Sequence, residues 1–491
     1  MDVGSNSIRL VVFEARSRAP LPVFNEKVLC GLARGMAKTG RLNPDGVSLA
    51  LQNIGRFVKL GVAMGARLEG FATAAVRDAE DGPDFVAELH RRFGLELSVL
   101  EGKEEARLSA LGVIADMPEA DGVMGDLGGG SLELVSFSDA TPGTSVTLPI
   151  GPLNLQVASG DDLKLAASIV RQHIESVEWL PQMAGRNFYP VGGAWRALAR
   201  IHMAQTNYPL RVVDHYAVKR GKIESVTDLI CQMSRKSLEK LPGVPRMRLD
   251  TLPLAAVLLR EVLAVGKPKS LVFSAFGLRE GYAFDRLSAD LQAEDPLLAT
   301  CRALARRNAR FGAIGEEIFE WSSPLFAEGG SELARERLLR HASCLLGDIA
   351  WSDHPDYRAV QALLRILRLS VLSVDHPGRA FLALATYSRY GGGRDVREAS
   401  VARALTDEES HTRARSLGLV QRLGYTLSGG APGLLAKTRL MLDGDRLLLE
   451  LAEDMADLFA EVAERRFQSV ASAMNLKPEV LVGGVARLVG G

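Results

Sequence analysis

The sequence predicts an α/β protein of four units: two α/β lobes of related design, an all-α unit and a small α+β unit at the C-terminal end. Three observations predict this. Strand and helix patterns alternate from the start of the chain, the same order of elements restarts near residue 122, and helical patterns dominate from about residue 295. The unit boundaries that we expect are 1–121, 122–288, 295–405 and 406–491.

The first lobe opens with a short turn and a β-branched strand at residues 8–15. We expect a helix over 44–66, because Asn43-Pro44-Asp45 is typical of a helix start. Residues 68–79 are predicted to form a buried strand that runs into a turn of small residues. The lobe then continues with a helix at 84–93, a strand at 95–100 and a helix at 103–116.

The second lobe repeats this order. Residues 122–137 are predicted to form a strand, a glycine turn and a strand, and residues 145–150 a third strand. A helix near 161–178 and a strand that ends at Val191 follow, and a strand, turn and helix over 271–284 complete the lobe.

The last two units differ from the lobes. Residues 295–405 are largely helical and rich in Arg, Ala and Leu. Asp443-Gly444-Asp445 stands between two apolar runs and predicts a β-hairpin over 439–452. We expect a long amphipathic helix over 453–475 and a frayed tail after it.

Composition limits the class of protein. Of the 491 residues 47% are hydrophobic and 24% charged, and Lys+Arg and Asp+Glu are equal at 59 each, so the net charge does not indicate a nucleic-acid partner. The four cysteines show no CxxC spacing, which excludes a zinc knuckle or a disulfide framework. No apolar stretch reaches the ~20 residues that cross a bilayer. We therefore expect a cytoplasmic protein that binds neither nucleic acid nor membrane.

Two glycine loops share the pattern Asp-x-Gly-x-x-Ser between strands. Glycine lets backbone N–H groups approach a phosphate, and serine hydroxyls add donors. The aspartates only accept hydrogen bonds, so they are candidates for holding Mg²⁺ or a metal-bound water. Each loop alone could be a simple hairpin turn, but the repeated pattern favours a phosphate site. The residues concerned are Asp2, Gly4, Ser5, Asn6 and Ser7 in the first loop, and Asp126, Gly128, Gly129, Gly130 and Ser131 in the second.

Other charged residues could complete a site. Glu104 and Glu105 open a helix, where acidic residues usually complement the helix dipole, although one of them could instead activate a water as a general base. Glu133 could join Asp126 around a metal or face solvent on its strand. Arg77 could bind a phosphate with two hydrogen bonds or form a surface salt bridge.

Further motifs are less specific or absent. Gly192-Gly193, and Gly277 with Arg279, are candidate phosphate turns. The P-loop, the dinucleotide fingerprint, the nucleophile elbow and the HExxH pattern do not occur. The helical unit carries residues that suggest a metal phosphohydrolase, but no histidine is followed by aspartate, so we expect structural or surface roles for His341, Asp348, His354, Asp356 and His376.

Six segments stand in a specific order: DVGSNSIRLVVFE, ATAAVRDA, VLEGKEEARLSALGV, GDLGGGSLELV, YPVGGAWRALAR and SAFGLREG. Together they cover roughly residues 2–285 and resemble the exopolyphosphatase / guanosine pentaphosphate phosphatase family. The resemblance implies two ribonuclease-H-like lobes of the actin-like ATPase fold. It implies that the rest is the extension of longer members: a helical unit similar to metal phosphohydrolases without their metal site, and a small α+β unit.

The resemblance also implies roles for the candidate residues. Glu105 matches the general base for the attacking water, and Asp126 and Glu133 match the acidic residues around Mg²⁺ and the scissile phosphate. The phosphate cradle matches residues 4–7 and 128–131 with Arg77, and its opposite wall matches Gly192-Gly193.

The implied activity is hydrolysis of inorganic polyphosphate by a homodimer whose added units help form a basic channel, for which Arg246 and Arg248 are candidates. Three alternatives stay open: a guanosine pentaphosphate 5′-phosphohydrolase using the same site, a non-catalytic sensor of polyphosphate or nucleotide, and a kinase or ATPase of the wider superfold.

Two positions depart from the family pattern. Asp2 directly follows Met1, whereas family members usually carry several apolar residues before this aspartate. We therefore expect a short first strand and a poorly anchored first loop. Asp81 stands where the family often has asparagine, which we expect to weaken any phosphate contact there.

Overall fold

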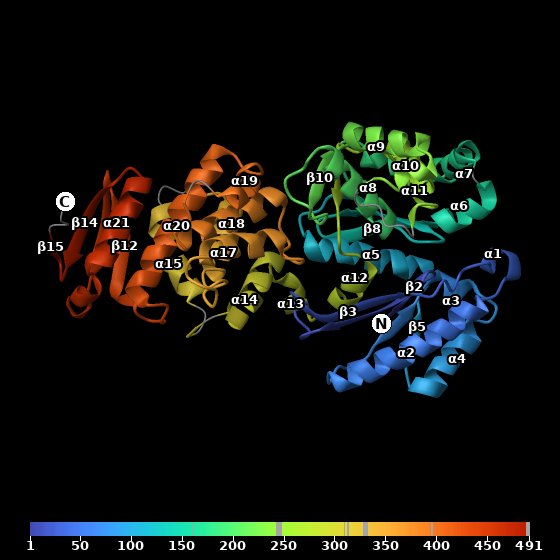
Figure 1. Ribbon diagram of the computed structural model, residues 1–491, viewed down its shortest axis with the longest axis horizontal. Helices are drawn as coiled ribbons and strands as arrows, with labels where there is room; N and C mark the ends of the chain where they lie inside the picture. Colours follow the sequence, from blue (N-terminus) through green and yellow to red (C-terminus); the bar gives the residue numbers. More distant parts are fainter. Residues whose placement is uncertain are drawn as a thin grey trace. The chain divides into compact units, whose positions relative to one another are not determined.

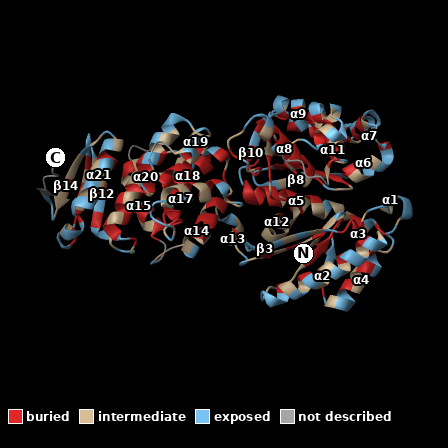
Figure 2. Cartoon of the chain, viewed as in Figure 1, coloured by how far each residue is buried: buried red, intermediate tan, exposed pale blue. Residues whose placement is uncertain are grey.

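The structure is a computed structural model that describes residues 1–160, 162–241, 248–308, 310–311, 314–327, 332–393 and 396–487. The chain forms two compact units, Met1–Ala293 and Glu294–Gly491 (Figure 1). Each unit has buried residues along the inward faces of its helices and strands (Figure 2). None of the helices in the described part of the chain is long and apolar enough to cross a membrane. The predicted division into four units stays a prediction.

The first unit begins with a five-stranded sheet in the order β3-β2-β1-β4-β5. Along β2 every second residue is buried, as expected for a strand with one face on a core. Ile8, Leu10 and Val12 on that face pack with Ile54 and Phe57 of helix α2. The elements of this part are β1 (Asp2–Val3), β2 (Ser7–Phe13), β3 (Pro22–Leu29), α1 (Met36–Thr39), α2 (Pro44–Ala63), β4 (Gly70–Ala72), α3 (Ala74–Asp78), α4 (Gly82–Phe93) and β5 (Leu97–Val99).

A six-stranded sheet follows in the order β10-β11-β9-β6-β7-β8. Its strands are β6 (Gly122–Leu127), β7 (Leu132–Ser138), β8 (Thr141–Leu148), β9 (Asn187–Val191), β10 (Tyr216–Lys219) and β11 (Ser270–Phe273). One face of this sheet packs through Val123, Leu134 and Phe188 on a helical layer. The helices of this part are α6 (Pro152–Ser159), α7 (Leu163–Glu175), α8 (Gly193–Gln205), α9 (Arg220–Gln232), α10 (Arg235–Leu238) and α11 (Leu252–Gly266).

Helices α5 (Gly102–Asp116) and α12 (Leu278–Phe284) lie between the two sheets (Figure 1). One side of α5 packs on the second sheet, where Ala110 contacts the cluster of Val135 and Phe137. The other side packs through Leu108 on Phe71 of the first sheet. α5 therefore belongs to both cores.

Glycines allow α5 and α12 to approach each other closely. A Cβ atom added to Gly281 would lie 1.8 Å from the backbone oxygen of Leu108, and one added to Gly112 would lie 2.2 Å from that of Gly277. No side chain fits at such distances, so the contact depends on glycine at both positions.

The second unit is a set of helices followed by a four-stranded sheet in the order β12-β13-β14-β15. β12 pairs with β13 over Thr438–Asp443 and Arg446–Leu451, as the predicted hairpin requires. The elements are α14 (Pro296–Asn308), α15 (Gly315–Ala327), α16 (Ala334–Leu345), α17 (Arg358–Arg368), α18 (His376–Arg389), α19 (Arg397–Arg403), α20 (Glu408–Ser428), β12 (Thr438–Asp443), β13 (Arg446–Leu451), α21 (Glu461–Ala473), β14 (Lys477–Val482) and β15 (Val485–Arg487). The short α13 (Ala289–Ala293) ends the first unit.

Three local predictions are wrong. The turn expected before Arg77 is the short helix α3. The continuous helix expected over 453–475 is interrupted: Glu453–Leu458 form a 3-10 helix, and α21 begins only at Glu461, because Ala460 is extended and Phe459 is buried against Phe467. The described part of the tail is not frayed: Gly483 and Gly484 both have positive φ and form the two-residue turn that joins β14 to β15.

Candidate active site

The two glycine loops have the same internal geometry. In the first, the Gly4 amide donates to the Ser7 carbonyl at 3.0 Å, and in the second the Gly128 amide donates to the Ser131 carbonyl at 3.1 Å. Each loop connects two antiparallel strands, β1 to β2 and β6 to β7. The shared sequence pattern therefore corresponds to a shared turn.

Each loop is also held by the segment that follows the third strand of its sheet. The amides of Cys30 and Gly31 donate to the Asn6 carbonyl, and the Ala33 amide donates to that of Ser5. The amides of Gly151 and Leu153 donate in the same way, at 2.9 Å, to the carbonyls of Gly130 and Gly129. β1 is two residues long, but the expectation of a poorly anchored first loop is wrong, because the residues after β3 supply the anchor.

The loops approach each other. A Cβ added to Gly129 would lie 3.8 Å from the Cβ of Ser5. Within the described residues no acceptor receives a hydrogen bond from the amides of Ser5, Asn6, Gly129 or Gly130. Converging backbone N–H groups of this kind can bind an anion.

Three carboxylates form an acidic group beside the loops: Glu105, Asp126 and Glu133. Asp126 of β6 and Glu133 of β7 are paired directly across the two strands, so their side chains share one face of the sheet. That face is the one against α5, whose Ser109 donates to Asp126 at 2.7 Å. Glu105 lies in the first turn of α5, one turn before Ser109.

Burial and mutual repulsion set the protonation of the acidic group. Burial, and then the charge of Asp126, raise the pKa of Glu105 from 4.5 to about 7, against the lowering effect of Arg77. Burial, followed by Glu105 and Asp126, raises the pKa of Glu133 well above its ordinary value. Burial also raises the pKa of Asp126, and the Ser109 hydrogen bond opposes it. The three groups therefore favour either protons or a cation.

The donor set of the acidic group fits a hard divalent cation. Glu133 is 2% exposed, and its Oε1 atom is buried with no hydrogen-bond partner among the described residues. Carboxylate oxygens are the ligands that Mg²⁺ prefers. Asp2 lies close enough to raise the pKa of Glu105, but it also forms an ion pair with Arg279 at 3.6 Å.

A basic cluster accompanies the acidic group and consists of Arg9, Lys27, Arg196, Arg248 and Arg279. Burial, followed by the charge of Arg279, lowers the pKa of Arg9 to about 10. Burial, and then Arg248 and Arg9, lower the pKa of Lys27. Burial is also the main cause of the lowered pKa values of Arg196 and Arg248. Positive charges that destabilise one another favour an anion between them.

The sequence indicated this cluster only in part. Arg248 and Arg279 were named, and Arg246 lies outside the described residues. Arg9 and Arg196 were missed although both lie within the motif segments. Arg9 is on the half-buried face of β2, opposite the face that packs on the core. Lys27 carries no local signal, because its role depends on the pairing of β3 with β2.

The remaining predicted residues are placed as follows. Arg77 donates to the Leu100 carbonyl at 2.9 Å and to the Glu105 carboxylate at 3.3 Å. It is therefore paired with the acidic group, and its predicted contact with a phosphate stays a prediction. Gly192 and Gly193 follow β9 beside the end of β6, at the same sheet edge as the second loop. Asp81 accepts from the Leu42 amide at 2.9 Å.

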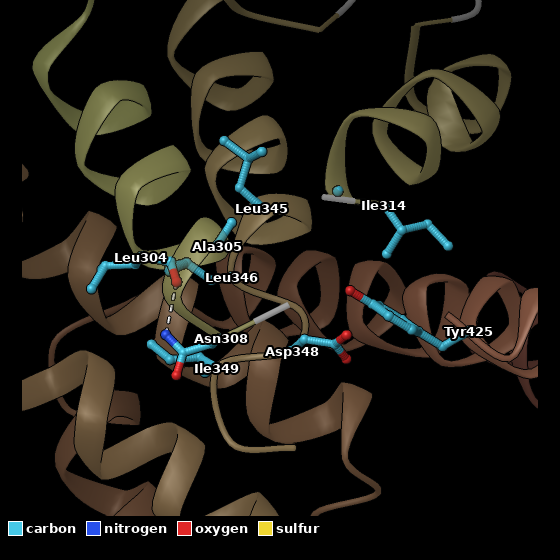
Figure 3. Close-up of a pocket in the computed structure, with 10 residues that line it drawn as sticks. Leu304, Ala305, Asn308, Ile314, Leu345, Leu346, Asp348, Ile349 and Tyr425 are labelled. Atoms are coloured by element: carbon cyan, nitrogen blue, oxygen red, sulfur yellow. Dashed lines mark hydrogen bonds between the residues drawn. The ribbon is translucent and has the colours of Figure 1, made fainter. Parts of the chain in front are cut away.

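The helical unit holds Asp348 in a polar environment. Arg310 and Arg389 each approach its carboxylate to 3.2 Å. Asp348 also lines a cavity of about 10 Å³, the size of roughly one water molecule, and its carboxylate points toward Tyr425 (Figure 3). His341 pairs with Glu316 at 2.5 Å, and these contacts are of the structural kind that the sequence predicts.

One buried set of possible metal ligands lies apart from the acidic group. Among the described residues, Asp116, Asp214 and His215 place ligand atoms within 4.8 Å of one another. His215 pairs with Asp116 at 3.0 Å, and Asp214 accepts from the Ala275 amide at 2.7 Å. The set ties the C-terminal end of α5 to the segments before β10 and after β11.

Comparison with known proteins gives consistent matches. Residues 11–290 match the Ppx/GppA phosphatase family, and residues 297–481 match the C-terminal domain described for exopolyphosphatase. Exopolyphosphatase 1 of Mycobacterium tuberculosis (strain CDC 1551 / Oshkosh) is 36% identical over 155 residues, 31% of this chain and 45% of the relative. The match thus spans less than half of that relative's length. Retrograde regulation protein 2 of Saccharomyces cerevisiae is 24% identical over 354 residues, 65% of this chain and 58% of the relative.

Solved structures show the same fold. The Aquifex aeolicus member of the Ppx/GppA protein family superposes with a TM-score of 0.51 at 23% identity, covering 57% of this chain and 94% of that one. An exopolyphosphatase from Cytophaga hutchinsonii gives a TM-score of 0.53 at 18% identity, covering 60% and 97%. The predicted fold class, two actin-like lobes followed by further units, is confirmed.

Proposed function

The chain belongs to the Ppx/GppA phosphatase family, and on this basis we propose that it hydrolyses the terminal phosphoanhydride of inorganic polyphosphate and releases orthophosphate. One observation carries the proposal. Glu105, Asp126 and Glu133 lie together in an acidic group in which Glu133 is buried and the other two are partly buried, next to two loops with available amide donors and a cluster of basic side chains. Such a site can hold a phosphate, a cation and a proton acceptor at once.

In the proposed reaction Glu105 is the general base. A water molecule attacks the terminal phosphorus, the bond from phosphorus to the bridging oxygen breaks, and Glu105 takes the proton that the water loses. A base is most effective when its pKa lies near the working pH, and burial brings the pKa of Glu105 to about 7. Arg77 donates to the Glu105 carboxylate at 3.3 Å and helps to hold it in place.

Asp126 and Glu133, with Asp2, are the residues that we propose as Mg²⁺ ligands. Mg²⁺, when bound, would neutralise charge on the phosphate oxygens. Two observations among the described residues support this assignment: Glu133 Oε1 has no hydrogen-bond partner, and Ser109 is the side chain that donates to Asp126.

The loops and the basic cluster serve the substrate. The amides of Ser5, Asn6, Gly129 and Gly130 are suited to the oxygens of the terminal phosphate. The buried Arg279 Nη1, which has no hydrogen-bond partner in the described structure, is suited to the phosphate that leaves with the shortened chain.

The test is phosphate release from long-chain polyphosphate with Mg²⁺, comparing the wild-type protein with Glu105→Gln. We expect turnover to fall by about 10²–10⁴-fold, the usual contribution of a general base. Glu104→Gln is the matched control, because Glu104 is the neighbouring glutamate but pairs with Arg107 at 2.8 Å, and it should keep its turnover. Near-full turnover in Glu105→Gln would remove the base assignment.

The same site could act on guanosine pentaphosphate. Measured kcat/KM values on both substrates distinguish the two activities, and a clear preference for the nucleotide would overturn the polyphosphate assignment. Tight binding of polyphosphate without phosphate release would show a sensor, and phosphate transfer to or from adenine nucleotides would show a kinase or ATPase.

We also propose that the protein is a cytoplasmic homodimer, in keeping with the family that its motifs resemble. Light scattering coupled to size-exclusion chromatography tests the dimer, and a mass of one chain at working concentration would exclude it. Cell fractionation tests the location.

A further inference from the structure

Ser109 is a polar side chain in the most buried part of helix α5. The residue has no exposed surface, and its buried neighbours along the helix are small or apolar, including Ala106, Ala110 and Val113. A buried serine in a helix usually donates to the carbonyl four residues earlier. Ser109 instead donates across to Oδ2 of Asp126 at 2.7 Å.

The hydrogen bond joins two structural elements at the acidic group. Its donor stands one helical turn after Glu105, so both side chains project from the same side of α5. Its acceptor ends β6, the strand that leads into the second glycine loop. One helix thus carries the proposed base and also the contact to a proposed metal ligand.

The bond fixes which oxygen of Asp126 is available. Oδ2 is occupied by Ser109 and lies 3.8 Å from the position that a Cβ on Gly277 would take, so it faces the interior of the unit. Asp126 is only partly buried, and Oδ1 accepts no hydrogen bond from the described residues. Oδ1 is therefore the oxygen that remains for a cation.

We propose that Ser109 is a positioning residue, whose hydroxyl holds the Asp126 carboxylate so that Oδ1 is presented to the divalent cation. The inference rests on the proposed function, because it assumes that Asp126 is a metal ligand. A hydrogen bond to a carboxylate is stronger than one between neutral groups, and partners that orient a metal ligand affect metal affinity by about 10–100-fold. The hydrogen bond also offsets the free-energy cost of burying the Ser109 hydroxyl.

The experiment compares Ser109→Ala with Ser109→Thr, which keeps a hydroxyl on the same carbon. Ser159→Ala is the matched control, since Ser159 is also a buried helical serine of the first unit but donates at 2.8 Å only to the Leu155 carbonyl of its own helix. The measurements are Mn²⁺ binding to the metal-free protein by electron paramagnetic resonance, the Mg²⁺ dependence of turnover, KM for polyphosphate at saturating Mg²⁺, and the melting temperature.

We expect Ser109→Ala to weaken Mn²⁺ binding by about 10–100-fold and to raise the Mg²⁺ concentration for half-maximal turnover by a similar factor. KM for polyphosphate should stay within about threefold of the wild-type value, and Ser109→Thr should bind Mn²⁺ within about threefold of it as well. Ser159→Ala should leave Mn²⁺ binding unchanged.

Wild-type Mn²⁺ affinity in a folded Ser109→Ala protein would overturn the inference and leave the proposed function standing. If Ser109→Ala does not fold, Ser109→Thr decides: loss of Mn²⁺ binding by a folded Thr variant would equally overturn it. A wild-type protein that neither binds Mn²⁺ nor turns over polyphosphate would overturn the proposed function itself.

Discussion

Replacing Glu105 by glutamine should stabilise the metal-free protein at neutral and alkaline pH, although it abolishes the proposed base. The cause is the carboxylate's environment. The Glu105 side chain is 14% exposed, and partial burial and the charge of Asp126 raise its pKa from the ordinary 4.5 to about 7. Glutamine has nearly the same shape but never carries the charge that this environment disfavours.

The sign and size follow from proton linkage. A carboxylate whose pKa is raised by folding ionises first in the unfolded chain, so its stabilising effect is complete below pH 4.5 and is lost as pH rises to about 7. One unit of pKa corresponds to about 1.4 kcal/mol, so the rise of the Glu105 pKa from 4.5 to about 7 corresponds to about 3 kcal/mol of lost stability. Glutamine also changes the contact with Arg77, so we expect a net gain of roughly 2–3 kcal/mol at pH 8.

The assay is urea unfolding in the presence of EDTA at pH 4.5 and pH 8. Hydrogen exchange of peptides from α5 reports on the first unit separately from the second, which matters because the two units need not unfold together. We expect the free energy of unfolding of the wild-type unit to fall between the two pH values by about 3 kcal/mol more than that of Glu105→Gln.

Equal pH dependence in the two proteins, within about 1 kcal/mol, would refute the argument that burial and Asp126 hold a proton on Glu105. Mg²⁺ provides a second check. A cation bound at Asp126 and Glu133 stabilises the folded state by mass action and favours ionised Glu105, so saturating Mg²⁺ should reduce or reverse the advantage of glutamine.

Two further predictions concern stability away from the acidic group. Gly281→Ala should destabilise the first unit by at least about 2 kcal/mol, because its Cβ would lie 1.8 Å from the Leu108 carbonyl oxygen. The control is Gly221→Ala on α9, where a Cβ has room, and thermal melting should show it to be neutral or slightly stabilising. Equal effects of the two substitutions would contradict the close-contact argument. Arg340→Ala should destabilise the second unit by at least about 2 kcal/mol in urea, because it removes the 2.9 Å partner of Glu332 and leaves only Arg413, at 3.3 Å, beside that buried carboxylate. A loss below about 1 kcal/mol would show that the buried pair is not needed.

Much of the candidate site could be predicted because each of its motifs is a short, continuous segment of the sequence. The glycine loops lie between adjacent strands, and Glu105 follows a strand at the start of a helix, so periodicity and turn chemistry locate them. The same local rules predicted the hairpin over 439–452 and helix α5 almost to the residue.

What could not be predicted depends on tertiary contacts. Arg9, Lys27 and Arg248 come from separate segments and meet only because β3 pairs with β2 and the two sheets enclose α5. Ser109 looks like an ordinary small residue on a helix until β6 is placed beside it. The helix is interrupted before α21 because the Phe459 side chain is buried in the core, and helical propensity alone does not predict such a tertiary contact.

The position of α5 has a consequence for how the molecule could open and close. Because α5 packs on β7 and its Ser109 is bonded to β6, Glu105, Asp126 and Glu133 share one rigid body with the second glycine loop. Any motion of the first sheet relative to this body has to take place where Leu108 of α5 packs on Phe71, and it would carry the first loop toward or away from the acidic group. The contacts proposed for the substrate would then change with lobe angle, while Glu105, Asp126 and Glu133 keep their positions relative to one another.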